Sequence, residues 1–317
     1  MALGTIGGNG RTTARVEQEI FSQGKDLKGS GFRLMVLSTL ALSILILVVL
    51  IVDVFTDGWS VLSTRLGPFI SGTLRSTATD EALGISQGLT GTLWIAIFVI
   101  VLSFPIGIAS AIYLEEYATP SKLTSAIDIA IRNLAGVPSV VYGLLGLFLF
   151  VAPFNDDRTL AAGGLTLAIL VLPIVVITSA EAIRAVPSSL KQGAYGVGAT
   201  KWDVIRTQVL PFAAPGILTG TLLSLSRAIG EAAPLILVGA VTGRLAARDR
   251  SIASLDQLTD RFTAMPIVIV GWIQDAPRDP VNFPAAAGAA IVILLVLVIA
   301  MNSVAVLLRS YFEKKRG

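Results

Sequence analysis

Long apolar segments alternate with polar segments along most of the chain. Six of the apolar segments are close to or above the roughly 20 residues that a helix needs to cross a bilayer. They cover residues 34–52, 89–114, 128–150, 160–180, 211–241 and 283–308. Because lipid offers no water to unpaired backbone groups, helices are the structures that such segments form. The pattern predicts an all-α transmembrane protein with six helices.

Polar segments divide the chain between these helices. We expect an N-terminal tail at residues 1–33, a peripheral first helix at 34–56, an outer loop at 57–84, a helical core at 85–310 and a C-terminal tail at 311–317. Within the last outer loop, residues 265–273 are apolar but too short to span. We expect this stretch to pack on the bundle as an interfacial or re-entrant piece.

Lys and Arg are distributed unevenly between the loops. When the N-terminus is placed in the cytoplasm, every Lys falls on the cytoplasmic side. Short cytoplasmic loops carry an excess of basic residues, whereas long outer loops follow this rule poorly. The distribution predicts a multi-pass membrane protein with both termini in the cytoplasm.

The composition excludes several kinds of chemistry. Hydrophobic residues make up 54% of the 317 residues and charged residues only 14%, against about 25% charged in soluble domains. The chain has no Cys and no His, which excludes disulfides, thiolate metal sites and Ser-His-Asp triads. A nucleotide-binding P-loop is also missing. We therefore expect no catalytic residue, no metal, no cofactor and no nucleic-acid partner for this chain.

The cytoplasmic loop at residues 186–210 is predicted to contain two short helices. Ser189 and Gln192 have the spacing of a capping box, as do Thr200 and Asp203. Between them, Gly198 can adopt the left-handed conformation that ends a helix. The result is a compact helix–turn–helix knob. From the residues alone, amphipathic helices lying on the lipid surface fit almost equally well.

This loop resembles the EAA loop of ABC importer permeases. Gly198, Leu210 and Pro211 stand at the spacing of that motif, while Gln192 replaces its Glu and Gln208 its Ile. The resemblance implies that the loop docks into an ATP-binding subunit and transmits its motion. The residues that it assigns to coupling are Gln192, Gly193, Ala194, Gly198, Ala199, Thr200, Lys201 and Trp202.

Three further stretches, residues 133–143, 165–173 and 226–234, resemble those of phosphate ABC transporter permeases. The ending Gly-Glu-Ala-Ala-Pro of the last stretch is similar to the PstA-type subunit more than to its PstC-type partner. The resemblance covers about residues 85–310. It implies a type I importer (MetI-like) core of five helices preceded by one peripheral helix.

The same resemblance implies a complex in which this chain pairs with a PstC-like permease. Two ATP-binding subunits would hold ATP and Mg, and an extracytoplasmic phosphate-binding protein would deliver phosphate for transport by alternating access. A permease for sulfate, molybdate or another oxyanion is the alternative within the class, as is the PstC-type subunit itself. A membrane enzyme is disfavoured, because the spans hold no His, no Cys and no paired Asp.

Two charged residues lie within the fifth predicted span. Arg227 and Glu231 are four residues apart, so they can pair on one helix face. Charges inside a membrane are costly and commonly face a bundle interior or a cavity. An anion crossing the membrane needs a positive group, and Arg offers planar donors. We expect the pair to lie on the substrate pathway; a structural ion pair that fixes the helix is the alternative.

Other intramembrane positions give weaker signals. Gly136 and Pro138 interrupt the third predicted span, where a packing kink is favoured over a discontinuous helix of the kind found near transport sites. Thr178 and Ser179 are candidate hydroxyls lining the pathway. The sequence places the candidate pathway on Arg227, Glu231, Thr178 and Ser179.

Overall fold

The computed structural model describes residues 27–75, 77, 79, 81–155, 157–243, 245 and 255–314. It separates into two compact units, Met1–Asp53 and Val54–Gly317, which are described separately. Five described helices are long and apolar enough to cross a membrane, or six if one bent pair counts as a single span. The described residues are helical except for connecting segments and one isolated β-bridge between Thr73 and Leu83, so the predicted all-α fold is confirmed.

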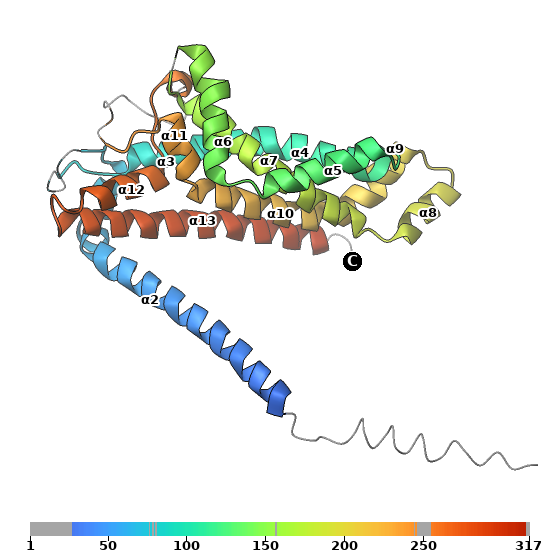
Figure 1. The fold of residues 1–317 in the computed structure, drawn as a ribbon, viewed down its shortest axis with the longest axis horizontal. Helices are drawn as coiled ribbons and strands as arrows, with labels where there is room; N and C mark the ends of the chain where they lie inside the picture. The colour runs from blue at the N-terminus through green and yellow to red at the C-terminus, as the bar shows by residue number, and fades with distance from the viewer. Residues whose placement is uncertain are drawn as a thin grey trace, which may run out of the picture. The chain divides into compact units, whose positions relative to one another are not determined.

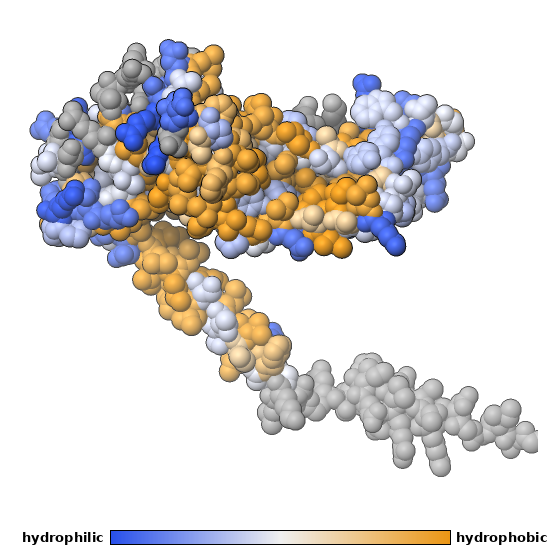
Figure 2. Space-filling view, turned by 45° about the horizontal axis from the view of Figure 1, so that its top comes forward, coloured by the Kyte–Doolittle hydropathy of each residue, from blue (hydrophilic) through white to orange (hydrophobic). Residues whose placement is uncertain are grey.

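The first unit contributes the beginning of one long helix, α2 (Leu27–Ser71). Every described side chain from Gly29 to Asp53 is exposed, although most are apolar. Figure 2 shows this apolar surface along the helix. Lipid is the solvent that suits such a surface, and the predicted first span lies within it. The predicted N-terminal tail falls mostly outside the described residues.

The outer loop predicted at residues 57–84 is partly wrong, because α2 continues to Ser71 with one non-helical residue at Arg65. Its last turns bury Val61 and Phe69 in a cluster with Trp272, and the two aromatic rings lie 5.8 Å apart. Burial of one apolar face stabilises a helix despite the Gly, Ser and Thr in this stretch. Tertiary packing therefore overrides the local composition.

The second unit is a bundle around α7 (Leu160–Arg184) (Figure 1). The second span consists of α3 (Ser86–Phe98), a π-helical turn at Val99–Ser103, α4 (Phe104–Ile112) and a second π turn at Tyr113–Tyr117. Helices α10 (Leu210–Gly230) and α13 (Asn282–Lys314) complete the long spans. Helix α7 packs against α3, α4 and α10, which makes it the centre of the core.

The third predicted span is two helices rather than one. Helix α5 (Lys122–Ala135) is followed by α6 (Ser139–Gly146), which continues through a π turn at Leu147–Val151 and a 3₁₀ turn at Ala152–Phe154. The chain bends by 101° between them (Figure 1). The favoured packing kink was thus wrong, because Pro138 removes a donor and disfavours helix at the residue before it.

The fifth predicted span is also interrupted. Helix α10 ends at Gly230, Glu231 is extended with φ −79° and ψ 122°, and α11 (Ala233–Val238) follows. A continuous helix over residues 211–241 was therefore wrong. The physical reason is Pro234, whose ring would clash with the carbonyl of Gly230 four residues earlier in an unbroken helix.

The short apolar stretch of the last outer loop forms α12 (Met265–Asp275). Helix α12 packs on α13 and α3, and the Met265 N–H donates to Thr92 Oγ1 at 2.8 Å. Most of its apolar side chains are buried. The prediction of a short segment packed on the bundle is confirmed. A 3₁₀ turn at Leu255–Thr259 precedes it.

Candidate coupling and transport site

The knob predicted within residues 186–210 consists of α8 (Ser188–Gly196), α9 (Lys201–Val204) and a π turn at Ile205–Val209 that leads into α10. Gly198 lies between the two helices with φ +86°, so the predicted left-handed conformation is confirmed. A Cβ atom at this position would meet nothing within 4 Å. The backbone conformation, and not lack of space, is what calls for glycine here.

One of the two predicted capping boxes is present. Thr200 Oγ1 accepts from the Asp203 N–H at 3.3 Å, and Asp203 Oδ2 accepts from the Thr200 N–H at 3.2 Å. The box predicted for Ser189 and Gln192 is wrong, because α8 begins at Ser188 and no side chain caps it. Ser189 consequently lies inside the first turn, where it cannot serve as the N-cap.

The predicted coupling residues divide into two sets. Ala194 and Ala199 pack against a buried cluster that includes Ile183 and Val204. The exposed set consists of Gln192, Gly193, Gly198, Thr200, Lys201 and Trp202. Next to Gly198, the Val197 side chain is 86% exposed. Exposed apolar side chains beside a rigid turn are typical of a protein-binding surface.

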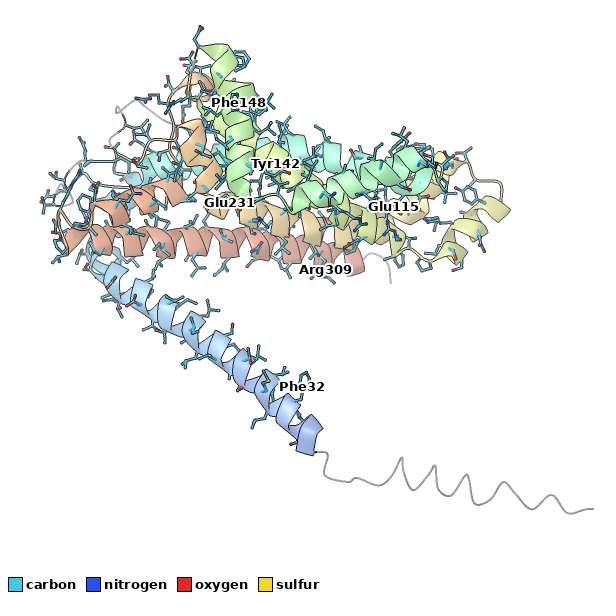
Figure 3. All side chains as sticks on the ribbon, in the orientation of Figure 1. Phe32, Glu115, Tyr142, Phe148, Glu231 and Arg309 are labelled. Atoms are coloured by element: carbon cyan, nitrogen blue, oxygen red, sulfur yellow. The ribbon has the colours of Figure 1, made fainter. Side chains whose placement is uncertain are left out.

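Three residues at the end of the second span contact the knob or its base, and none of them was predicted from the sequence. Glu115 pairs with Arg184, Glu116 with Lys191, and the Tyr117 ring lies under the Lys201 ammonium (Glu115 is labelled in Figure 3). Two consecutive carboxylates directly after an apolar span were the available signal. Periodicity could not show it, because the partners lie about 70 to 85 residues further along.

The Arg227–Glu231 pair predicted from the spacing is present. Arg227 Nε lies 3.3 Å from Glu231 Oε1, and Figure 3 labels Glu231 at the break after α10. The Arg227 side chain is 56% exposed and that of Glu231 18%. The pair therefore presents its cation outward from this chain while its carboxylate is largely covered. Its single long hydrogen bond is weaker than a bidentate one.

The two helix breaks lie next to each other. Helix α6 packs against α11, and a Cβ atom at Gly143 would come within 2.7 Å of Pro234 Cα. Only a residue without a side chain allows this approach. Tyr142, which Figure 3 labels, is next to Gly143 in the chain, and its hydroxyl donates to the Leu134 carbonyl across the first break. Interrupted helices that meet are typical of transport sites, but a transport role for Gly136 and Pro138 stays a prediction.

Thr178 and Ser179 lie inside the bundle. Thr178 packs against Gly220 of α10, and its hydroxyl donates to the Val175 carbonyl at 3.3 Å. Ser179 is fully buried, and its hydroxyl has no hydrogen-bond partner within the part of the chain that the structure describes. Their role in lining the pathway stays a prediction.

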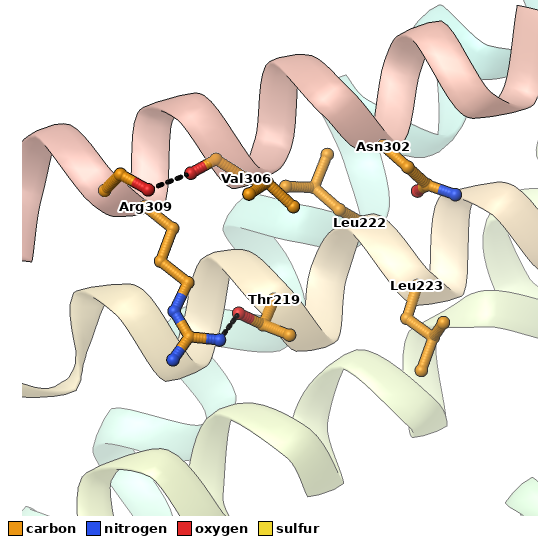
Figure 4. A pocket seen from close by; sticks show the side chains of 7 residues that line it. Thr219, Leu222, Leu223, Asn302, Val306 and Arg309 are labelled. Carbon is orange, nitrogen blue, oxygen red and sulfur yellow. Dashed lines mark hydrogen bonds between the residues drawn. The ribbon is translucent and has the colours of Figure 1, made fainter.

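A pocket of about 370 Å³ lies between α10 and α13 (Figure 4). It is lined by Thr219, Leu222, Leu223, Asn302, Val306, Arg309 and Ser310. Arg309 Nη1 donates to Thr219 Oγ1 at 3.4 Å. Thr219, Leu223 and Arg227 follow one another at four-residue spacing on α10, so they share one helix face. Arg227 and this pocket therefore lie along the same face of α10.

An apolar helical core with two interrupted spans and an exposed knob is the architecture of a membrane-embedded transport subunit. The family described as binding-protein-dependent transport system inner membrane component matches residues 103–316. The chain belongs to this family of inner-membrane permease components. It is accordingly a multi-pass inner-membrane protein.

Individual relatives agree with this membership. The phosphate transport system permease protein PstA 1 of Mycobacterium tuberculosis (strain CDC 1551 / Oshkosh) is 33% identical over 265 residues, covering 83% of this chain and 82% of the relative. The phosphate transport system permease protein PstC of Mesorhizobium japonicum (strain LMG 29417 / CECT 9101 / MAFF 303099) is 32% identical over 223 residues, covering 61% and 67%. The predicted resemblance to phosphate ABC permeases of PstA type is confirmed.

A solved structure shows the same fold. The chain superposes with a TM-score of 0.61 on one chain of the crystal structure of a bacterial alginate ABC transporter in complex with an alginate pentasaccharide-bound periplasmic protein. The match covers 89% of this chain and 96% of that chain, at 15% identity. At this identity the similarity establishes the type I importer fold alone.

Proposed function

We propose that this chain is the PstA-type permease subunit of an ATP-driven phosphate importer. The relatives named above supply the substrate class. The knob around Gly198 supplies the link to ATP, because its exposed surface suits a docking partner and the sequence carries no P-loop of its own. The chain would therefore act through two ATP-binding subunits, which hold ATP and Mg.

The single observation that carries the proposal is the conformation of the knob. A glycine with positive φ, fixed between a short helix and a capped one, holds Val197 and Trp202 at the surface. Such a rigid projection can transmit a displacement, which a flexible loop cannot. Closure of the ATPase dimer would move the knob and open the membrane cavity outward to receive phosphate from the binding protein.

Arg227 is the residue that would bind the phosphate anion in the membrane. A desolvated phosphate is expensive in a low-dielectric passage unless a cation meets it. Half of the Arg227 side chain is open to whatever lies against α10, and a PstC-like permease would close the passage on that side. Glu231 would hold the arginine while the passage is empty. Both termini would lie in the cytoplasm, as the distribution of Lys indicates.

A permease for sulfate or molybdate is the second candidate, because a lone arginine does not distinguish tetrahedral oxyanions. The PstC-type role is disfavoured by the shorter coverage of the PstC relative. Purification of the tagged chain from its own membranes tests the assembly. We expect two further subunit types and ATPase activity in the complex, and no ATPase activity in the chain alone. Activity that scales with the pure chain would refute the proposal.

A further inference from the structure

The end of the second span contacts three separate parts of the coupling region through three consecutive residues. These residues, Glu115, Glu116 and Tyr117, belong to the π turn Tyr113–Tyr117 that follows α4. Their partners are, in order, Arg184, Lys191 and Lys201. Arg184 ends α7, Lys191 lies on α8 and Lys201 begins α9. One short segment thus contacts the base of the knob and both of its helices.

The first contact is a two-pronged ion pair. Arg184 Nε donates to Glu115 Oε2 at 3.2 Å, and Arg184 Nη2 donates to Glu115 Oε1. A guanidinium that binds both carboxylate oxygens fixes orientation as well as distance. The Arg184 side chain is largely exposed while that of Glu115 is mostly covered. This pair ties the end of the second span to the end of α7.

The second contact is the more shielded of the two ion pairs. Lys191 Nζ lies 2.5 Å from Glu116 Oε1, and the side chains are only 24% and 7% exposed. Separating a covered pair leaves a charge that water cannot fully solvate, so such a pair resists separation more than an exposed one. Helix α8 and the second span are therefore expected to move together.

The third contact is a cation–π interaction between the second span and α9. Lys201 Nζ lies 4.9 Å from the centroid of the Tyr117 ring, within the range of a cation–π interaction. A π turn holds more residues than an α turn, so consecutive side chains diverge less around its axis. The turn thereby helps three neighbouring side chains to reach α7, α8 and α9. The backbone closes it with the Ala118 N–H donating to Tyr113 O at 2.8 Å.

Chain connectivity shows why these contacts matter. The knob is continuous in sequence with α7 before it and with α10 after it. A displacement of the knob therefore reaches those two spans through the backbone. The second span ends at Tyr117 and is separated from α7 by the whole of α5 and α6. It can follow the knob only through non-covalent contacts.

We propose that Glu115, Glu116 and Tyr117 form a strut that transmits movement of the knob to the second span, with Glu116 as its principal positioning residue. This inference rests on the proposed function, in which the knob docks on an ATP-binding subunit. The strut is a further coupling element, separate from the docking of the knob. The knob couples ATP hydrolysis to α7 and α10 directly, and to the second span through the strut.

The first test compares charge variants in the complete complex reconstituted in proteoliposomes. Glu116→Gln should retain the ATP-binding subunits and basal ATPase activity, while phosphate taken up per ATP hydrolysed falls about tenfold, as expected for a lost coupling contact. The swap Glu116→Lys with Lys191→Glu should restore most of that ratio. Asp275→Asn is the matched control, because Asp275 and Arg278 form an ion pair at 2.8 Å at the end of α12, away from the strut. The control should leave the ratio unchanged.

The second test excludes misfolding of a variant as the cause of lost coupling, because it compares one sample with and without the linker. The chain has no cysteine, so Glu116→Cys with Lys191→Cys can be joined by a short bis-methanethiosulfonate linker and released by a reductant. Uptake per ATP should be high while the linker is present and fall after reduction in the same sample. The wild-type complex, treated in parallel, should not respond.

The outcomes separate the two proposals. If Glu116→Gln keeps the wild-type ratio, or loses the ATP-binding subunits while the linker has no effect, the strut is refuted. In either case Gly198→Val still reports on the knob, because it should uncouple the complex whether or not the strut exists. If Gly198→Val behaves as wild type, the knob itself is not the coupling element and the proposed function fails at that point.

Discussion

The Tyr142 hydroxyl donates a hydrogen bond to the main-chain oxygen of Leu134, 2.9 Å away, across the break between α5 and α6. The bond adds to the packing of α6 and to the backbone bond from the Val137 N–H to the same Leu134 oxygen. We expect Tyr142→Phe to lower the free energy of unfolding by about 1 kcal/mol, the usual net contribution of one hydrogen bond. Thermal unfolding of the purified complex measures this, and Tyr113→Phe is the control, since the Tyr113 side chain is exposed.

If the break is part of the transport site, Tyr142→Phe should also slow phosphate uptake by more than the loss of stability explains. Unchanged uptake at a temperature where the variant is fully folded would show that the break is only architectural.

Arg227 should be required for transport. Arg227→Ala removes the cation from the exposed face of α10 and should abolish uptake while leaving the complex assembled. Arg227→Lys should restore uptake only in part, because Lys keeps the charge but not the planar fork. Glu231→Gln should be milder, since the cation stays. Initial rates of radiolabelled phosphate uptake give the ranking.

The double variant Arg227→Ala with Glu231→Ala tests the structural alternative. If the pair merely fixes the helix break, removal of both charges leaves neither unpaired, and uptake should return. Uptake restored to the wild-type rate would therefore contradict a pathway role for Arg227.

Gly198 and Gly196 form a matched pair for the knob. Neither would meet a neighbour if a Cβ were added, but only Gly198 has a positive φ. Gly198→Val should therefore strain the turn and lower coupled uptake strongly, because a β-branched residue resists this conformation. Gly196→Ala should be neutral. Equal effects of the two changes on uptake and on retention of the ATP-binding subunits would mean that the left-handed turn has no special role.

The capping residues of the knob give a smaller and separate prediction. Thr200→Ala removes the cap of α9 and should lower its stability by about 1 kcal/mol. Ser189→Ala should cost little, because Ser189 does not cap α8. Hydrogen exchange of the amides in Lys201–Val204 and Ser188–Gly196 reports each helix separately. Faster exchange in α8 than in α9 after Thr200→Ala would contradict the assignment.

The length of the apolar segments and the capping patterns predicted most of the architecture. These predictions succeeded where residues close in sequence determine the local structure. The Thr200 cap and the positive φ of Gly198 depend on residues within three positions of each other, so the sequence shows them directly. The break after α10 depends on Pro234 acting against a strongly apolar background. The mean hydropathy of a long apolar segment hardly changes when it contains one proline. The expected continuous helix over residues 211–241 was wrong for that reason.

Contacts between distant segments could not be predicted. Burial of Phe69 against Trp272 extends α2 into a stretch whose composition suggested a loop. The pairing of Glu116 with Lys191 joins the end of the second span to helix α8 of the knob, and neither charge has a partner within its own helix that spacing would reveal. Arg227 and Glu231 were found because their pairing is local.

The central claim is that this chain carries phosphate when its knob is driven by ATP. The most direct measurement is phosphate uptake by proteoliposomes that hold the complete complex, with ATP enclosed on the side of the knob and the binding protein on the other side. The account predicts that labelled phosphate accumulates only when both ATP and the binding protein are present, and that excess sulfate or molybdate does not compete. Accumulation without ATP, or efficient competition by sulfate, would contradict it.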